Sequence, residues 1–311
     1  MKKVISLILC LCTSLFLLTA CNDVNKSSTE DAMGLLKKSS DYYKNVKNVE
    51  IDSVIDSVMI YNDMFTGEPV ICGTKLDVTT VMYNEPFRFT SEVLSTYDDT
   101  IEDGGISYIM QNNTKSTQHG VGEGDKISVY QFAKEEWLRV DLTNEDFVLN
   151  DTLGLNYITN YDKFVTDGKI IGKEKVDDFD TIKAEFTMNE DYAKIMYKKY
   201  GFEEFAKLID KTNTDKAILD MMKNAKFTVW FNEKNDEVVK VEVDLTSLMD
   251  SFRKIVIEDN KEHLSEEKYA YLNESADKIS IKNTIKFSNV DKNESFELPE
   301  EAKEAKVYGQ D

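Results

Sequence analysis

Two neighbouring stretches near the end of the chain decide the fold: residues 226–232 read KFTVWFN and residues 238–246 read VVKVEVDLT. In each stretch apolar side chains recur at every second position, and polar residues 232–236 separate the two. Successive side chains of a β-strand point to opposite faces of a sheet, so this alternation predicts an antiparallel hairpin with one buried and one solvated face. Its buried positions would be Phe227, Val229, Phe231, Val239, Val241, Val243 and Leu245.

The same alternation recurs outward along the chain, and it predicts about ten strands with four or five helices between them. Turn residues separate the strands, and no linker rich in Pro, Gly or Ser divides the chain. We therefore expect one domain over residues 29–311, built on an antiparallel sheet. The further strand-like stretches are residues 51–61, 75–83, 87–97, 106–110, 127–132, 137–142, 169–176, 181–188 and 279–287.

Several local features accompany this pattern. Apolar spacing predicts an amphipathic helix over residues 29–47, capped near Ser28. Residues 84–86, Asn-Glu-Pro, predict a turn. Residues 111–126 are polar and predict a loop, Cys72 lies in a turn-like run with Gly and Pro, and residues 249–276 predict helix at least in their second half.

The N-terminus has the layout of an export signal. Lys2 and Lys3 precede the apolar residues 4–18, and the sequence Leu-Thr-Ala-Cys then ends at Cys21. This arrangement resembles the lipobox of bacterial lipoproteins, and it implies that residues 1–20 are a signal peptide, that Cys21 carries the lipid, and that residues 21–28 form a tether. Plain secretion and a retained membrane anchor are the alternatives. Only Cys72 would then remain as a free thiol.

The order of elements resembles the LolA-like lipoproteins. A helix follows the lipobox, long strands meander through the turn at residues 84–86, a hairpin follows late in the chain, and residues 298–305 read LPEEAKEA. The resemblance implies an α+β fold: a strongly curved antiparallel β-sheet, an open half-barrel, with helices packed on the concave face. It also implies a cell-envelope protein anchored outside the cytoplasm of a bacterium, for which we expect a Gram-positive source.

Composition excludes several function classes. The formal net charge is −20, so the chain lacks the basic surface that nucleic acids require. His119 and His263 have no metal-binding neighbours, and the acidic run from Asp291 lacks the glycine and glutamate of an EF-hand. No nucleophile elbow or phosphate loop is present. We therefore expect no enzyme activity, cofactor or metal.

A lipid or other hydrophobic molecule, held in the concavity of the sheet, is the ligand that the resemblance implies. Flexible Met221 and Met222 and the aromatic Trp137 and Trp230 are the candidate contacts, because such side chains suit apolar ligands. All four could equally be packed in the core. The alternative function is a surface interaction or sensory lipoprotein with a packed, ligand-free core.

Overall fold

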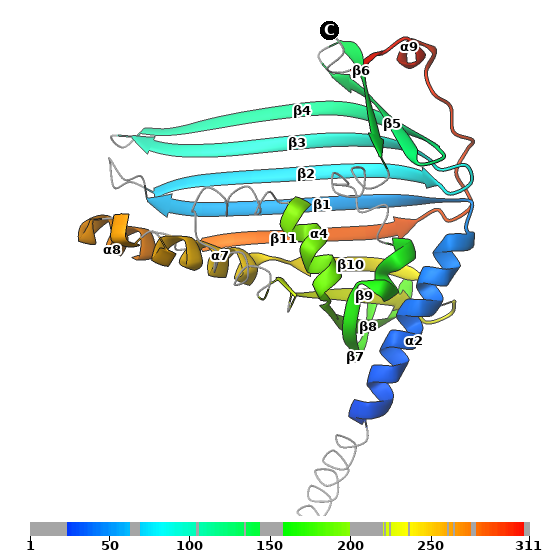
Figure 1. The fold of residues 1–311 in the computed structure, drawn as a ribbon, viewed down its shortest axis with the longest axis horizontal. Helices are drawn as coiled ribbons and strands as arrows, with labels where there is room; N and C mark the ends of the chain where they lie inside the picture. Colours follow the sequence, from blue (N-terminus) through cyan, green and yellow to red (C-terminus); the bar gives the residue numbers. More distant parts are fainter. Residues whose placement is uncertain are drawn as a thin grey trace, which may run out of the picture.

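The computed structural model describes residues 24–62, 69–103, 106–133, 135–143, 158–199, 220, 222–223, 225–235, 237–259, 261–263, 265–274 and 278–307. In these residues twelve strands form one sheet, in the order β12-β6-β5-β4-β3-β2-β1-β11-β10-β9-β8-β7. Neighbouring strands are antiparallel, except that the short β12 pairs parallel to β6. The long middle strands lie side by side, and the strands at both ends turn away from them (Figure 1). The predicted fold class, an open curved antiparallel sheet with helix on one face, is confirmed.

The strands differ widely in length, and the longest lie in the middle of the sheet. They are β1 Asn48–Asn62, β2 Pro69–Tyr83, β3 Arg88–Asp103, β4 Ile106–Glu123, β5 Lys126–Ala133, β6 Glu136–Thr143, β7 Val165–Val176, β8 Phe179–Met188, β9 Lys226–Asn232, β10 Val238–Asp244, β11 Lys278–Ser288 and β12 Lys306–Val307. The described helices are α2 Val24–Asn45, η1 Ile158–Lys163, α4 Glu190–Lys199, α7 Thr246–Asp259, η2 Lys261–His263, α8 Glu266–Glu274 and α9 Glu300–Lys303.

Helix α2 packs on one face of the sheet, which we call the inner face; the opposite face is the outer face. Leu36 and Tyr43 of α2 are fully buried in the same apolar cluster as Val49 of β1 and Phe287 of β11. The Tyr43 hydroxyl donates a 2.8 Å hydrogen bond to the backbone carbonyl of Val238 in β10. This bond satisfies the one polar group that burial of the tyrosine would otherwise leave unpaired.

Two loop side chains hold the C-terminal end of α2. The Asn84 amide, from the turn between β2 and β3, donates to the carbonyls of Tyr43 and Val46 at 2.8 and 2.7 Å. The Asp291 carboxylate accepts the Lys47 backbone N–H at 2.6 Å. Carbonyls at the end of a helix have no partner within it, so the predicted turn at Asn84 also serves as a helix cap.

Two glycines make room for aromatic rings on the inner face. Gly120 of β4 lies directly opposite Phe89 of β3, and Gly168 of β7 lies opposite Phe186 of β8. A Cβ atom at Gly120 would lie 1.8 Å from the Phe89 ring, and one at Gly168 would lie 2.4 Å from the Phe186 ring. Each ring therefore covers the backbone of the neighbouring strand, a close approach that only glycine permits.

Four local expectations differ from the structure. Helix α2 begins at Val24, so part of the expected tether is helical; no Pro or Gly interrupts that stretch. Strand β4 continues to Glu123 through the expected loop, because its polar residues pair with β3 and then with β5. Cys72 lies in β2, where Pro69 occupies the first position, which a strand tolerates. Helix α7 begins at Thr246, whose N–H is capped by Asp244 at 2.9 Å.

Replacing Gly120 by alanine should destabilise the protein by about 1–3 kcal/mol, because the Phe89 ring must leave its position to admit a methyl group. Gly172→Ala, at a strand glycine whose Cβ would meet nothing within 4 Å, is the matched control and should be close to neutral. Urea unfolding of both variants measures the difference. Equal stabilities would contradict the close approach of ring and backbone.

Candidate functional site

The inner face of the sheet changes from closed to open along the length of its strands. Directly opposite residues share a face, so the ladder of β1, β2 and β3 can be followed row by row. In the row nearest the end of α2, Val49, Met82 and Phe89 are 0%, 1% and 1% exposed. Further along, Ile55 and Leu76 are half-buried, and Tyr97 is 38% exposed. The inner face is thus closed near the C-terminal end of α2 and becomes more accessible further along the strands.

Two adjacent rows on this accessible side have described side chains, and we call them the open half. Each row crosses five strands, from β11 through β1, β2 and β3 to β4. All ten side chains are uncharged, although 31% of the residues in the chain are charged. The rows are Asn283, Ile55, Leu76, Ser95 and Thr114, and Ile281, Ser57, Thr74, Tyr97 and Asn112.

The open half combines aliphatic side chains with hydroxyl and amide groups. Such a surface can hold an apolar or hydroxyl-bearing molecule by contact and hydrogen bonding, whereas a charged ligand would find no charged group there to pair with. Within the described residues no three His, Cys, Asp or Glu side chains are grouped to hold a metal ion. No helix in the described part of the chain is long and apolar enough to cross a membrane.

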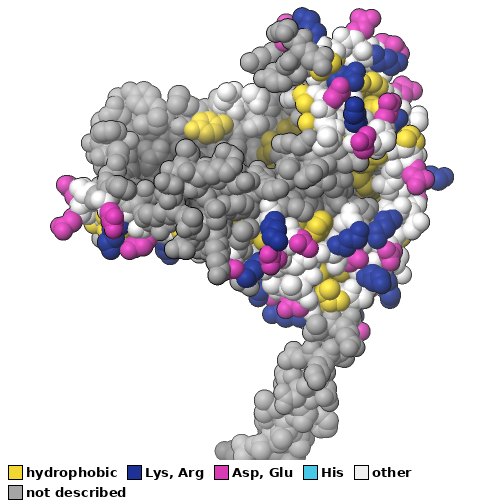
Figure 2. Space-filling view, in the orientation of Figure 1, with side chains coloured by type: hydrophobic (Ala, Val, Ile, Leu, Met, Phe, Trp, Pro, Cys, Tyr) yellow, Lys and Arg dark blue, Asp and Glu magenta, His cyan; other side chains and the backbone are white. Residues whose placement is uncertain are grey.

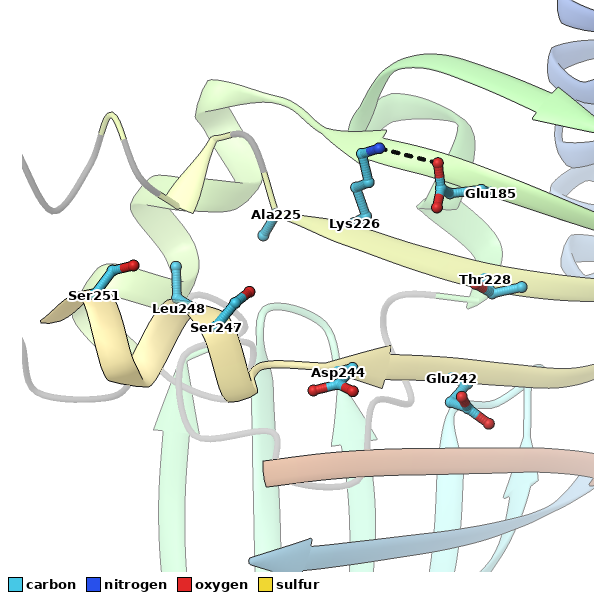
Figure 3. Close-up of a pocket in the computed structure, with 9 residues that line it drawn as sticks. All are labelled: Glu185, Ala225, Lys226, Thr228, Glu242, Asp244, Ser247, Leu248 and Ser251. Atoms are coloured by element: carbon cyan, nitrogen blue, oxygen red, sulfur yellow. Dashed lines mark hydrogen bonds and ion pairs between the residues drawn. The ribbon is translucent and has the colours of Figure 1, made fainter. Parts of the chain in front are cut away.

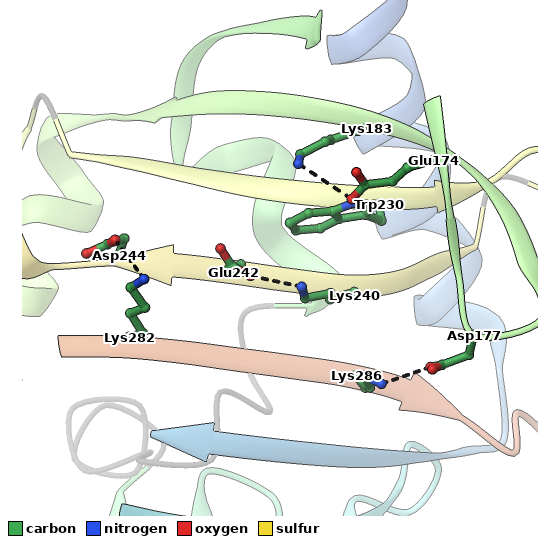
Figure 4. A network of polar contacts seen from close by, with 9 residues as sticks. All are labelled: Glu174, Asp177, Lys183, Trp230, Lys240, Glu242, Asp244, Lys282 and Lys286. Carbon is green, nitrogen blue, oxygen red and sulfur yellow. Dashed lines mark hydrogen bonds and ion pairs between the residues drawn. The ribbon is translucent and has the colours of Figure 1, made fainter. Parts of the chain in front are cut away.

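Trp230, a candidate ligand contact, lies on the outer face because it alternates with the inward Val229 and Phe231. Its ring is 2% exposed and lies between the ammonium groups of Lys183 and Lys240, 4.8 and 4.3 Å from the ring centroid. Its indole N–H donates to the Glu174 carboxylate, and this hydrogen bond lowers the pKa of Glu174 below its usual value (Figure 4). Trp230 is therefore a packed member of an outer-face ion-pair network.

The structure also places Trp137 and Met222 outside the rows of the open half. Trp137 is on the outer face, where it is half-buried beside Phe132 with ring centroids 5.2 Å apart. Met222 is 2% exposed in the core. Met221 and Cys21 lie outside the described residues. Neither tryptophan is placed to contact a ligand in the concavity, because a shift of one residue along a strand changes the face.

A polar cavity of about 320 Å³ lies on the outer face, between β8, β9, β10 and the first turn of α7. Glu185, Thr228 and Glu242 stand side by side across its floor (Figure 3). Burial raises the pKa of Glu185, but hydrogen bonds from Lys226 and Lys169 outweigh it, so the pKa is below its usual value. These carboxylates are occupied by neighbouring lysines, as is typical of a structural ion-pair cluster. Figure 2 shows the same interspersion of both charges over the described surface.

The residues of the open half were not among those predicted to contact a ligand. A signal for them is present: over residues 49–57, 74–82 and 89–97 the inward positions of β1, β2 and β3 are uncharged, while outward positions include Asp56, Lys75 and Glu92. Alternation between uncharged polar and charged residues is therefore as informative here as alternation between apolar and polar ones. It was hidden because Ser and Thr are ordinarily counted as outward-facing.

Comparison with known proteins yields structural likenesses only. No family model matches the chain, and no curated protein matches its sequence. Among solved structures, the lipoprotein LppX of Mycobacterium tuberculosis is 13% identical, with 85% of this chain and 97% of that chain covered and a TM-score of 0.41. LprF of Mycobacterium bovis is 11% identical, with 88% and 98% covered and a TM-score of 0.39.

A LolA superfamily protein of Nitrosomonas europaea is also similar, at 10% identity, 86% and 94% coverage and a TM-score of 0.22. The chain is similar to LolA-like lipoproteins. These are proteins of the kind that the sequence resemblance named. At such identities and TM-scores the likeness is one of general arrangement, and it carries no information about a ligand.

His119 of β4 is buried on the outer face among aromatic rings. Its ring centroid lies 5.6 Å from that of Trp137 and 6.1 Å from that of Phe296, which follows β11 and crosses the outer face. The Thr90 hydroxyl lies 3.1 Å from its Nδ1 atom. Burial lowers the pKa of His119 below 6.5, because the charged imidazolium loses its hydration there.

The free energy of unfolding should therefore decrease as the pH falls, because His119 becomes protonated more readily in the unfolded protein than in the folded one. Because the pKa of His119 is lower in the folded than in the unfolded protein, its contribution is fully present above about pH 6.5 and is lost as the pH falls from there towards the folded pKa. His119→Gln, which keeps a polar group opposite Thr90, should remove this part of the pH dependence. Unfolding free energies of both proteins between pH 8 and pH 5 test it; parallel curves would contradict the assignment.

Proposed function

We propose that this protein is a membrane-anchored, extracytoplasmic lipoprotein that binds a lipid or another hydrophobic molecule on the open half of the inner face and performs no catalysis. One observation carries the binding proposal: the inner face passes from rows that are almost fully buried to the two rows of the open half, which are half-buried or exposed and contain no charged side chain. A sheet face that only supported a core would be expected to become polar and charged where it meets water.

The anchor is proposed from the sequence. The basic residues Lys2 and Lys3, the apolar residues 4–18 and the run that ends at Cys21 form a lipoprotein signal. Residues 1–20 would be removed, and Cys21 would carry the acyl chains. Because α2 begins at Val24, two residues separate the lipidated cysteine from a helix that packs on the sheet. Two or three acyl chains suffice for stable anchoring.

The proposed ligand surface, the open half, combines aliphatic and uncharged polar side chains. Ile55, Leu76 and Ile281 offer aliphatic contact for a hydrocarbon chain, and Ser95 and Thr114 offer hydroxyl groups. The opposite end of the inner face is closed by Tyr43 and its neighbours, so a ligand would enter from the end of the strands that is remote from α2. This makes a hydrophobic molecule with a small polar group the best fit.

A second function is favoured by a different observation. The half of the inner face under α2 is packed, with Leu36 and Tyr43 fully buried against the sheet. If the open half were covered in the same way, the protein would have no ligand and would act as a surface interaction or sensory lipoprotein. Binding of a hydrophobic probe separates the two proposals.

Replacing Cys21 by alanine should abolish membrane anchoring, because Cys72, the other cysteine that follows the signal, lies within β2 and not at the end of a lipobox. The expected result is loss of acyl mass from the mature protein and its release from the membrane fraction. Cys72→Ala is the matched control and should remain anchored. A Cys21→Ala protein that is still lipid-modified would refute the proposed attachment site.

A carboxylate on the open half should weaken ligand binding by about tenfold or more, because a charge would be brought against an apolar ligand. Thr114 and Asn113 are adjacent, exposed residues of β4 that point to the inner and the outer face. Thr114→Asp should reduce binding of the neutral fluorophore N-phenyl-1-naphthylamine, whereas Asn113→Asp should not. Equal affinities in the two variants would place the ligand elsewhere; no binding by the unmodified protein would favour the packed alternative.

A further inference from the structure

The course of α2 across the sheet fixes which edge of the protein is nearest to its anchor. The C-terminal end of the helix is bound beside β10 and β11 through Tyr43. From there the helix runs past β9 and β8, contacts η1 and the edge strand β7, and its N-terminal turns extend beyond that edge (Figure 1). Strand β6, with β12, forms the other end of the sheet.

The length of α2 limits how far Cys21 can lie from the folded domain. Ala32 is fully buried in the core, and eight helical residues, Val24 to Asp31, precede it. At 1.5 Å per residue these span about 12 Å. The three steps from Val24 back to Cys21 add at most about 11 Å, since an extended residue spans no more than about 3.6 Å. An acylated Cys21 would therefore hold the bilayer surface within a short distance of β7.

Strand β7 has a composition suited to a lipid surface. It carries Lys169, Lys173 and Lys175 against two acidic residues, in a chain with 38 basic and 58 acidic residues. Ile171 is 45% exposed, at the position where a bulge interrupts the pairing with β8. Lysine stems with an exposed aliphatic side chain between them are typical of contacts at a membrane interface.

The first acidic group after β7 is engaged away from the strand. Asp177, in the turn after the strand, lies 2.9 Å from the Lys286 ammonium on the outer face (Figure 4). Lys169 and Lys173 are also within 3.1 and 3.0 Å of Glu185 and Glu233. At the opposite edge, β6, α9 and β12 together hold four acidic and three basic residues. Strand β7 by itself thus has a formal charge of +1, and β6, α9 and β12 together have −1.

We propose that the β7 edge is the membrane-facing surface of the anchored protein, and that Lys169, Ile171, Lys173 and Lys175 contact the headgroups of a bilayer containing anionic phospholipid. This inference rests on the lipidation of Cys21 in the proposed function. In this orientation the long strands run along the bilayer, and the acidic edge formed by β6 and α9 points away from it. The charge of the chain is thereby kept at a distance from anionic headgroups.

The test uses the full-length lipidated protein in vesicles of phosphatidylcholine with a fifth of phosphatidylglycerol. In a Cys72→Ser background, the mature chain offers one free thiol in each of two variants, Ile171→Cys and Val140→Cys. Val140 is the matched control, a 37% exposed aliphatic residue on the opposite edge strand β6. A fluorophore on each thiol is quenched by spin-labelled headgroups. We expect quenching at residue 171 and little or none at residue 140.

Charge reversal adds a second readout. Lys169→Glu, Lys173→Glu and Lys175→Glu should each reduce the population in contact with these vesicles by about fivefold or more, because the attraction of one lysine to an anionic surface is lost and a repulsion replaces it. The reduction should vanish in vesicles of phosphatidylcholine alone. Equal quenching at both sites, or stronger quenching at residue 140, would overturn the orientation. Protein that fails to float with the vesicles would overturn the lipidated anchor itself, which is a different and separately visible result.

Discussion

The docking of α2 on the sheet is the constraint on which the rest of the structure depends. Tyr43 is fully buried, and its hydrogen bond to the Val238 carbonyl joins α2 to β10. Asn84 and Asp291, from two loops, form hydrogen bonds with the C-terminal end of the same helix. Residues from positions 43, 84, 238 and 291 thereby meet at one point. The packed part of the inner face lies beside that point, and the open half lies further along the same strands.

The two faces of the sheet perform different tasks with the same backbone. The outer face is a mosaic of ion pairs, such as Lys183 with Glu174 and Lys286 with Asp177, which contribute little stability individually because they are exposed to water. The inner face contains no such pairs in the rows described for β1 to β4. This contrast between the faces fixes the pairing register of the strands. If one strand slipped by one residue against its neighbour, carboxylates such as Asp52 and Glu92 would move to the inner face.

The sequence was informative about the sheet and less so about the site. Strict alternation in Phe227, Val229 and Phe231 predicted the strands correctly, because burial of one face imposes it. The polar residues of β4 were misjudged as a loop, since pairing with two neighbouring strands overrode their local preference. The tryptophans were misplaced for another reason: aromatic character marks burial but not the face. The open half was not recognisable from residue type alone, because its definition depends on the register of five strands.

The paired phenylalanines and glycines have a consequence for how this sequence can change over time. Phe89 with Gly120, and Phe186 with Gly168, each occupy one shared volume across a strand boundary. Neither partner can be exchanged alone without either a clash or an empty space. Substitutions at these positions should therefore occur together: a smaller residue should replace the phenylalanine where a larger one replaces its glycine. Positions 31 and 18 residues apart in the chain would then vary together, while the surface around them drifts freely.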